Sequence, residues 1–312
     1  MTKKSTTMAP VVAWIGLGNM GRGMCRNLSA KGNLEKPLVI YNRTKKRADD
    51  LAAQLAPAKS TVVDSVQEAV KSADMVFTCL GDDKAVNETI DAALQGDVKG
   101  KLFVECSTIH PETTNALAER ILAKGAEFVA SPVFGPPAMA DAGQLVFVLA
   151  GPRPSVDKVK PYTTGVMGKS IIDFSDQQPG KATLLKVIGN TFVFNMIETL
   201  AEGHVLAEKS GLRSDDLHQF IEAVFPGPFT AYSDRMQLGE YYKREEPLFS
   251  ADLARKDAQH ALKLAEQSGT KMGAMEVIDK HLADVQKYAG PKGDVGGIYG
   301  AVRLESGMKY EN

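Results

Sequence analysis

The stretch Val11-Val12-Ala13-Trp14-Ile15-Gly16-Leu17-Gly18-Asn19-Met20-Gly21-Arg22-Gly23-Met24 decides the fold of this 312-residue chain. A short apolar run, typical of a strand, meets three glycines spaced Gly-x-Gly-x-x-Gly, and helix-compatible residues follow through Leu28. Gly16 permits a tight turn, Gly18 lets a pyrophosphate approach the backbone, and Gly21 lets the helix pack on the strand. The helix N-terminus behind them offers unpaired N–H groups to a phosphate. In this context the stretch predicts a dinucleotide site rather than a plain strand-to-helix turn.

The end of the second predicted strand, residues 37–41, indicates which dinucleotide is bound. NAD sites carry an acidic residue about 20 positions beyond the glycines, where it binds the ribose 2′-hydroxyl. Here the neutral Asn42 lies 21 residues after Gly21, with Arg43 and Thr44 beside it. A guanidinium at this place can stack on adenine and pair with a 2′-phosphate, which favours NADP over NAD. The alternative is a basic, solvated helix start.

Alternating strand and helix patterns run from residue 11 to about residue 174 and predict a parallel sheet covered on both faces. Ser107 and Thr108 follow the strand at residues 102–106, and ligands bind beyond the carboxyl ends of such strands. They are therefore candidates to contact cofactor or substrate, the alternative being a Ser/Thr N-cap before Pro111. We interpret His110 as a solvent-facing loop residue. Further strands are predicted at residues 74–80, 128–133, 144–150 and 170–174.

The second half of the chain predicts helices, the first of them over residues 181–210 with Gly211 as its C-cap. A helix of about 45 Å suits a connection between two domains. Its first turns are almost wholly apolar, yet they contain Lys186 and Asn190, four residues apart on one face. Burial lowers the pKa of a lysine, which suits a proton donor to a forming alkoxide. The alternative is a lysine whose ammonium reaches solvent.

Composition excludes several classes of protein. The net charge is −1, so no overall field points to nucleic acid or to an anionic membrane. The three cysteines lack metal-ligand spacing and are expected to be packing residues in a reducing compartment. The basic, Ser/Thr-rich first ten residues are expected to be a disordered tail. No apolar run approaches the roughly 20 residues that span a bilayer, so we expect a soluble, cytoplasmic protein without a metal.

These stretches together resemble the β-hydroxyacid dehydrogenase family, which includes 3-hydroxyisobutyrate dehydrogenase and glyoxylate/succinic semialdehyde reductase and shares the 6-phosphogluconate dehydrogenase type of NAD-binding domain. Gly16-Leu17-Gly18-Asn19-Met20-Gly21 matches its cofactor signature. The segment 105–113 resembles its substrate-binding segment, and Lys186-Val187-Ile188-Gly189-Asn190 its catalytic segment. The pair Lys256-Asp257, by pattern alone a solvated helix face, matches a pair beside the nicotinamide in relatives. The resemblance implies that Lys186 is the general acid/base and that relatives form dimers or tetramers.

The chain departs from the family where an anion is recognised. Relatives carry Ser-Gly-Gly at the position of Phe134-Gly135-Pro136, and they use that hydroxyl and those backbone donors on a substrate carboxylate. Phe134 removes the hydroxyl, and Pro136 removes an N–H. An Asp-x-Ser pattern of relatives is replaced by Gly297-Ile298-Tyr299, and Gly189 replaces the first of two asparagines. The resemblance therefore predicts the chemistry more firmly than a small 3-hydroxy acid substrate.

The sequence thus predicts an α/β Rossmann domain over residues 10–178 and an all-α domain over residues 179–312, joined by a long interdomain helix. We expect an NADP-dependent oxidoreductase acting on a carbonyl or alcohol, and a homodimer or homotetramer. Two rivals remain open: an imine reductase, and an NADP-binding interaction protein without turnover. The predicted cofactor residues are Gly16, Leu17, Gly18, Asn19, Met20, Gly21, Asn42, Arg43, Thr44, Leu80, Thr108 and Lys256. The predicted catalytic and substrate residues are Lys186 and Asn190, with Ser107 and Gly135 on the substrate.

Overall fold

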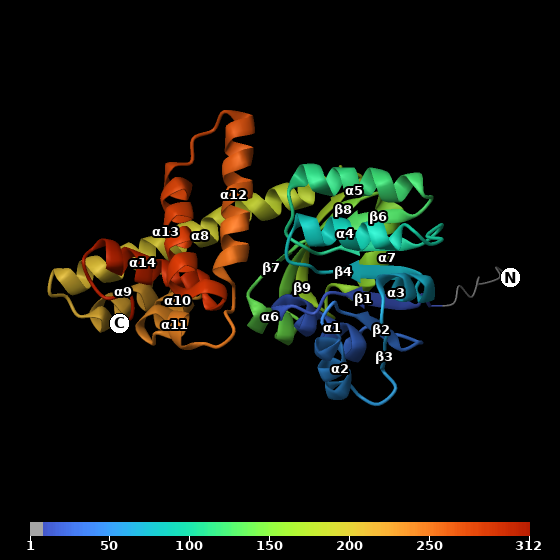
Figure 1. The fold of residues 1–312 in the computed structure, drawn as a ribbon, viewed down its shortest axis with the longest axis horizontal. Helices are drawn as coiled ribbons and strands as arrows, with labels where there is room; N and C mark the ends of the chain where they lie inside the picture. The colour runs from blue at the N-terminus through green and yellow to red at the C-terminus, as the bar shows by residue number, and fades with distance from the viewer. Residues whose placement is uncertain (1–8) are drawn as a thin grey trace. The chain divides into compact units, whose positions relative to one another are not determined.

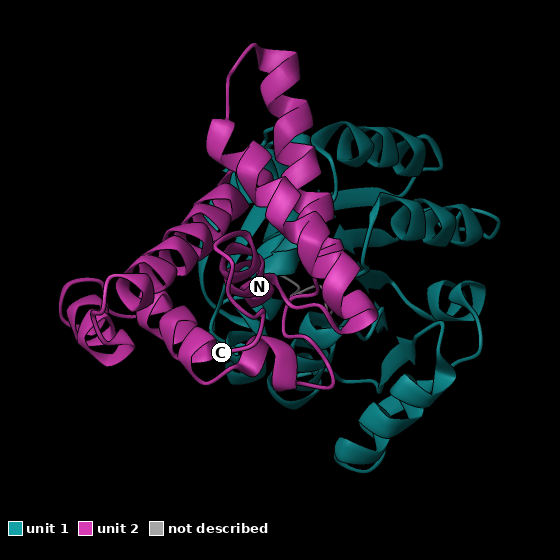
Figure 2. Ribbon diagram, turned by 60° about the vertical axis from the view of Figure 1, so that its left-hand side comes forward, with its two compact units in different colours: residues 1–186 teal, residues 187–312 magenta. Residues whose placement is uncertain are grey.

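The computed structural model describes residues 9–312, and the chain divides into two compact units, Met1–Lys186 and Val187–Asn312 (Figure 2). Unit 1 is an α/β unit and unit 2 is helical, so the predicted fold class is confirmed. Most of the leader that we expect to be a disordered tail lies outside the described residues.

Unit 1 is built on one sheet, whose strands follow the order β3-β2-β1-β4-β5-β6-β8-β7 with β9 paired to β8 (Figure 1). The pairs from β3 to β6 and the pair β8–β9 are parallel. The bounds of the described strands are β1 (Val12–Ile15), β2 (Leu38–Tyr41), β3 (Ser60–Val62), β4 (Met75–Thr78), β5 (Leu102–Glu105), β6 (Glu127–Ala130), β7 (Val133–Phe134), β8 (Leu145–Gly151) and β9 (Gly168–Ser175).

Helices cover both faces of this sheet, and the side chains of β1 show why. Val12 and Trp14 belong to one buried cluster, while Ala13 and Ile15 belong to the other, because successive side chains of a strand point to opposite faces. One cluster packs against α1, α2 and α7, and the other against α3, α4 and α5. The helices are α1 (Asn19–Lys31), α2 (Lys45–Gln54), α3 (Val66–Ser72), α4 (Asp83–Ala93), α5 (Pro111–Ala123), α6 (Pro137–Ala142) and α7 (Arg153–Val159), with a 3-10 turn η1 (Lys160–Tyr162).

The far edge of the sheet differs from the expected parallel arrangement. The predicted strand 128–133 is two strands, β6 and β7, and both pair antiparallel with β8. Ser131 and Pro132 interrupt it, and proline lacks the N–H that a continuous ladder needs. The short strand β3 was not predicted at all.

Helix α8 (Gly180–Lys209) begins in unit 1 and continues into unit 2, within a residue of its predicted bounds. By length and composition alone it could cross a membrane, although the sequence suggested no such run. Half of the qualifying window is buried inside the structure, and the core helix of a soluble protein passes the same test. Its buried residues Phe194, Ile197 and Leu200 lie in the core of unit 2.

Unit 2 packs its remaining helices around that core. Residues from α12, α13 and α14 join α8 in one buried cluster. The bounds are α9 (Ser214–Val224), α10 (Pro228–Gln237), α11 (Glu240–Lys243), α12 (Ala251–Ser268), α13 (Gly273–Ala289) and α14 (Ile298–Glu305), with 3-10 turns η2 (Gly290–Lys292) and η3 (Val295–Gly297). Gly297-Ile298-Tyr299, one of the departures from the family pattern, is buried where η3 meets α14.

Candidate functional site

The three fingerprint glycines have three different surroundings. Gly16 has φ +99°, and a Cβ there would lie 2.3 Å from the Cys79 carbonyl oxygen. A Cβ on Gly21 would lie 2.2 Å from the Gly16 carbonyl oxygen, so both positions require glycine for the fold itself. Gly18 has ordinary backbone angles and no atom within 4 Å of its Cβ position. The space in front of Gly18, at the N-terminus of α1, is therefore open to a ligand.

Two polar side chains hold this loop in place. The buried indole of Trp14 donates from Nε1 to the Gly16 carbonyl oxygen at 2.8 Å. Asn42 accepts from the Leu17 N–H at 2.9 Å and donates to the Thr44 carbonyl oxygen at 3.0 Å. Asn42 therefore joins the glycine loop to the turn that carries Arg43 and Thr44. Trp14 was not predicted as a site residue, because an indole in a strand is indistinguishable from core.

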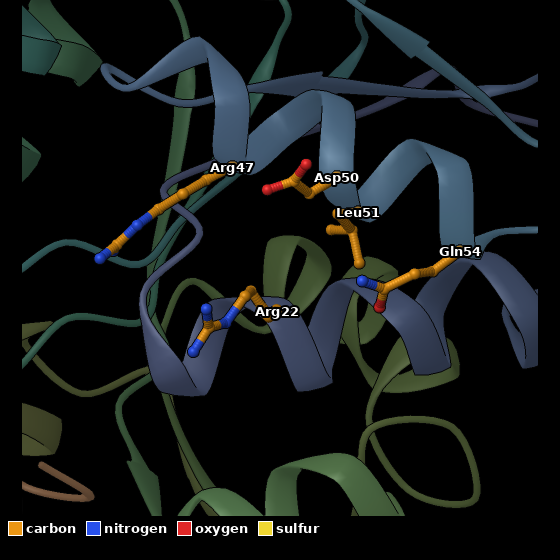
Figure 3. A pocket seen from close by; sticks show the side chains of 5 residues that line it. All are labelled: Arg22, Arg47, Asp50, Leu51 and Gln54. Atoms are coloured by element: carbon orange, nitrogen blue, oxygen red, sulfur yellow. The ribbon is translucent and has the colours of Figure 1, made fainter. Parts of the chain in front are cut away.

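A cavity of about 130 Å³ lies between α1 and α2 (Figure 3). It is lined by Arg22, Arg47, Asp50, Leu51 and Gln54, and both guanidinium groups extend toward the same side. Lys46 holds both carboxylate oxygens of Asp50 at 2.8 Å. The cations of this region therefore outnumber its carboxylates, which favours an anion. Arg22 also donates to Asn19 Oδ1 at 2.7 Å, which links the cavity to the glycine loop.

The carboxyl ends of β4 and β5 are tied together by Ser107. Its buried hydroxyl accepts from the Leu80 N–H at 2.8 Å, and its own N–H donates to Glu105 Oε1 at 2.6 Å. Glu105 also accepts from the Thr78 hydroxyl at 2.5 Å. Burial raises the pKa of the Glu105 carboxyl, against the opposing effect of these hydrogen bonds. Thr108, which follows, is only half-buried.

The surroundings of Ser107 correct two expectations from the sequence. Helix α5 is capped by His110, whose Nδ1 accepts from the Glu112 N–H at 3.3 Å, and not by a Ser or Thr. His110 is buried, so its interpretation as a solvent-facing residue was wrong. Glu105 was also missed, although a carboxylate at the end of an apolar strand is a signal that a sequence reader can use.

Lys186 lies near the sheet end, at the last position of unit 1. Its Nζ lies 4.7 Å from the centroid of the Phe134 ring, over its face. Burial raises the pKa of the Cys79 thiol to about 12, with Glu105 acting in the same direction and Lys186 against it. The lysine ammonium is therefore near a ring face and a neutral thiol, and it is only half-buried. Gly135, beside Phe134, has φ +131°.

In unit 2 the predicted residues form a second group. Asn190 Nδ2 donates to Asp257 Oδ2 at 2.7 Å, and Lys256 Nζ lies 3.0 Å from Asp257 Oδ1. Asp257 is 3% exposed, so the solvated-face interpretation of this pair does not hold for it. A buried carboxylate that accepts from an amide fixes how that amide is oriented. Asp257 thus positions Asn190, which is one turn after Lys186 on α8.

The fold therefore brings the predicted residues together in separate groups. In unit 1, hydrogen bonds link the glycine loop to Asn42 and Thr44, and Leu80 to Ser107, while Lys186 contacts Phe134. In unit 2, Asn190 and Lys256 share Asp257. Among the described residues, no cluster of three or more His, Cys, Asp or Glu side chains could hold a metal ion.

Comparison with known protein families covers both units. Residues 11–175 match the NAD binding domain of 6-phosphogluconate dehydrogenase, and residues 180–302 match the NAD-binding domain of NADP-dependent 3-hydroxyisobutyrate dehydrogenase. The NADH-dependent oxidoreductase ucdB of Aspergillus ustus is 38% identical over 292 residues, which cover 93% of this chain and 98% of that protein. The chain belongs to the β-hydroxyacid dehydrogenase family.

Two further similarities agree with membership of the family. Glyoxylate/succinic semialdehyde reductase 1 of Arabidopsis thaliana is 30% identical over 84% of this chain and 87% of its own length. The solved 3-hydroxyisobutyrate dehydrogenase of Mycobacterium tuberculosis shares the fold, with a TM-score of 0.77 at 24% identity over 95% of this chain and all of that one. As a member of this family, the chain is an NAD(P)-binding oxidoreductase that acts on CH–OH groups and on the corresponding carbonyl groups.

Proposed function

We propose that the protein is an NADP-dependent oxidoreductase that interconverts a small-molecule carbonyl and its alcohol, with Lys186 as the general acid/base. One observation carries the proposal: α8 places Lys186 one turn before Asn190, and a buried carboxylate, Asp257, fixes the Asn190 amide. That arrangement provides a proton donor and an oriented hydrogen-bonding group on one helix. The bound nicotinamide supplies the hydride.

The residues of the glycine loop fit such a cofactor. The open space at Gly18 lies where the first turn of α1 presents unpaired N–H groups, which suits a pyrophosphate. Asn42 fixes the turn that carries Arg43, and Arg43 itself is exposed. The cationic cavity at Arg22 and Arg47 lies next to this turn, on α1 and α2, and supports a further negative charge on the ribose. We therefore assign Arg43, with these two arginines, to the 2′-phosphate.

At the reacting carbon, Lys186 Nζ would give a proton to the alkoxide oxygen during reduction and remove it during oxidation. Asn190 would orient the substrate oxygen, and its own orientation depends on Asp257. Ser107 is buried and its hydroxyl already accepts from the Leu80 N–H, so we propose that it acts by fixing the strand end beneath the substrate. Gly135 would contact the substrate through its backbone beside Phe134, since the position of a Cβ there is already filled by Leu145 and Met139.

Lys186 argues against both alternative functions, the imine reductase and the binding protein without turnover. Imine reductases share this two-domain fold but generally lack the lysine. A binding protein without turnover would have no use for an ammonium held on a ring face one turn before an oriented amide. A screen separates the three: we expect NADPH consumption with aldehydes or ketoacids. Consumption only with cyclic imines would favour the imine reductase, and tight NADPH binding without any turnover the binding protein.

The preference for NADPH over NADH is a separate prediction. It matters because the relative ucdB is named as NADH-dependent. Changing Arg43 to Ala should weaken NADPH binding by roughly 1.5–3 kcal/mol, the worth of a charge-assisted hydrogen bond, and leave NADH binding nearly unchanged. Fluorescence titration of both cofactors measures it, with Lys45→Ala, at the exposed start of α2, as the control. Equal affinity of the native protein for NADH and NADPH would show that the preference is absent.

A further inference from the structure

We infer that the substrate of this site carries an aromatic or alkyl group, and not a carboxylate, a short chain away from its reacting carbonyl, with Phe134 as the residue that selects it. The inference rests on the proposed function, because it concerns the substrate that Lys186 protonates. It follows from the Phe134 side chain, which faces the lysine, and from the backbone that continues from β7 into α6.

We call the surface formed by Phe134, Gly135, Pro136 and Pro137 the wall of the site. The Phe134 ring has a fixed position in this wall. It ends β7, which pairs antiparallel with β8 so that Phe134 lies opposite Val146. The ring packs against the buried cluster that also contains Phe128, Ala130 and Val148, and it is half-buried. With Lys186 Nζ 4.7 Å from its centroid, the ring presents its face to the ammonium. The electron-rich face attracts the cation but cannot donate a hydrogen bond to an anion.

Beyond the Gly135 N–H, the backbone after Phe134 has no donor as far as Pro137. Pro136 and Pro137 follow Gly135 directly, and neither has an N–H. Gly135 cannot be given a donor side chain either, because its φ is +131° and a Cβ would lie 2.8 Å from Leu145 Cδ2 and 3.2 Å from Met139 Cβ. From Phe134 to Pro137, no side chain can donate a hydrogen bond.

A carboxylate placed at this wall would lose water without gaining matching donors. Removing an anion from water is costly unless several hydrogen bonds replace its hydration, and a single ammonium with a ring behind it supplies only part of them. An aryl or alkyl group loses nothing by leaving water and gains contact with the ring. The wall therefore discriminates by the group that the substrate carries near its carbonyl, while the proposed role of Lys186 concerns the carbonyl oxygen.

The test uses two aldehydes of the same chain length, succinic semialdehyde, which ends in a carboxylate, and 3-phenylpropanal, which ends in a phenyl group. For the native enzyme with NADPH we expect kcat/KM to be at least about tenfold higher for 3-phenylpropanal, the usual worth of filling an apolar pocket. Phe134→Ser should lower that value and raise the one for succinic semialdehyde. Phe134→Leu should keep the native order, since leucine is also apolar. Preference of the native enzyme for succinic semialdehyde, or equal changes for both aldehydes in Phe134→Ser, would overturn the inference.

A binding measurement keeps this outcome separate from failure of the proposed function. Titration calorimetry of the native protein with NADP⁺ present compares 4-hydroxybutyrate with 3-phenylpropan-1-ol, the two product alcohols. Tighter binding of the phenyl alcohol supports the inference even if neither aldehyde is turned over, in which case only the proposed reaction fails. Tighter binding of 4-hydroxybutyrate overturns it. Thermal unfolding of Phe134→Ser and Phe134→Leu confirms that both variants are folded before either experiment.

Discussion

At the scale of the single residue, Gly18 differs from Gly16 and Gly21 in the space around its Cβ position. Gly16 and Gly21 would bring a Cβ within 2.3 Å of backbone oxygens, whereas the Cβ position of Gly18 is open. The sequence pattern treats the three glycines alike, since spacing carries no information on which atoms lie opposite each one. The structure separates two glycines that the fold requires from one that only a ligand would require.

This difference predicts opposite behaviour of two variants. Gly18→Ala should change the free energy of unfolding by no more than about 0.5 kcal/mol, as at a surface site, but should weaken NADPH binding at least tenfold by filling the space for the pyrophosphate. Gly21→Ala should cost roughly 1–3 kcal/mol of stability, because its methyl group overlaps the Gly16 carbonyl oxygen. Urea unfolding and NADPH titration measure both. Loss of stability without loss of affinity in Gly18→Ala would contradict the assignment.

The residues proposed for the chemistry can be picked out from the sequence, whereas the residues that position them cannot. Lys186 and Asn190 stand out because polar side chains in an apolar helix are rare. Asp257 accepts from Asn190 across 67 residues of sequence. A hydrogen bond between residues so far apart leaves no local pattern, so the sequence does not distinguish this buried carboxylate from one on the surface. His110 was misread for the same reason, since its cap depends on the burial of α5.

At the scale of elements, long periodic segments were predicted well and short ones poorly. Helix α8 differs from its predicted bounds by about one residue at each end. The three-residue β3 and two-residue β7 carry too few residues for a period to be read. An apolar run also does not indicate whether a strand pairs parallel or antiparallel with its neighbour. The antiparallel pairing of β8 with β6 and β7 could therefore not be predicted from the sequence.

Helix α8 also carries a histidine that should make unit 2 sensitive to acid. His204 is 1% exposed and contacts the hydroxyls of Ser214 and Ser233 through its two ring nitrogens, at 3.1 and 2.8 Å. Burial, with a smaller contribution from the nearby His218, lowers the pKa of His204 to about 4. The unfolded chain therefore binds a proton that the folded chain does not, between pH 6.5 and about 4. Stability is fully present above that window and falls as the pH decreases through it.

The prediction compares native protein with His204→Gln, which keeps a hydrogen-bonding side chain but cannot titrate. Between pH 7 and pH 4 the native protein should lose about 3 kcal/mol more of its unfolding free energy than the variant does. Urea unfolding at a series of pH values gives the difference directly, and carboxylates that titrate in both proteins cancel. Parallel pH profiles would show that His204 is not responsible.

At the scale of the whole molecule, α8 predicts self-association. Phe192 is 74% exposed and Leu206 is 68% exposed, and with Ile188 they fall on one face at 100° per residue. Exposed large apolar side chains on one helix face are typical of an interface. We predict a homodimer or higher homo-oligomer, which Phe192→Glu should weaken. Light scattering at micromolar concentration checks it, and a monomeric native protein would refute it.

The most direct test of the account is a single turnover of NADPH with excess carbonyl substrate, followed by absorbance in native protein and in Lys186→Met. Removing the proton donor should slow NADPH oxidation by roughly 10²–10⁴, and Lys186→Arg should restore little, because a guanidinium does not release its proton near neutral pH. NADPH affinity should stay nearly native, since we assign the cofactor to the glycine loop and Arg43. Oxidation of NADPH at the native rate in Lys186→Met would contradict the central claim that Lys186 protonates the product.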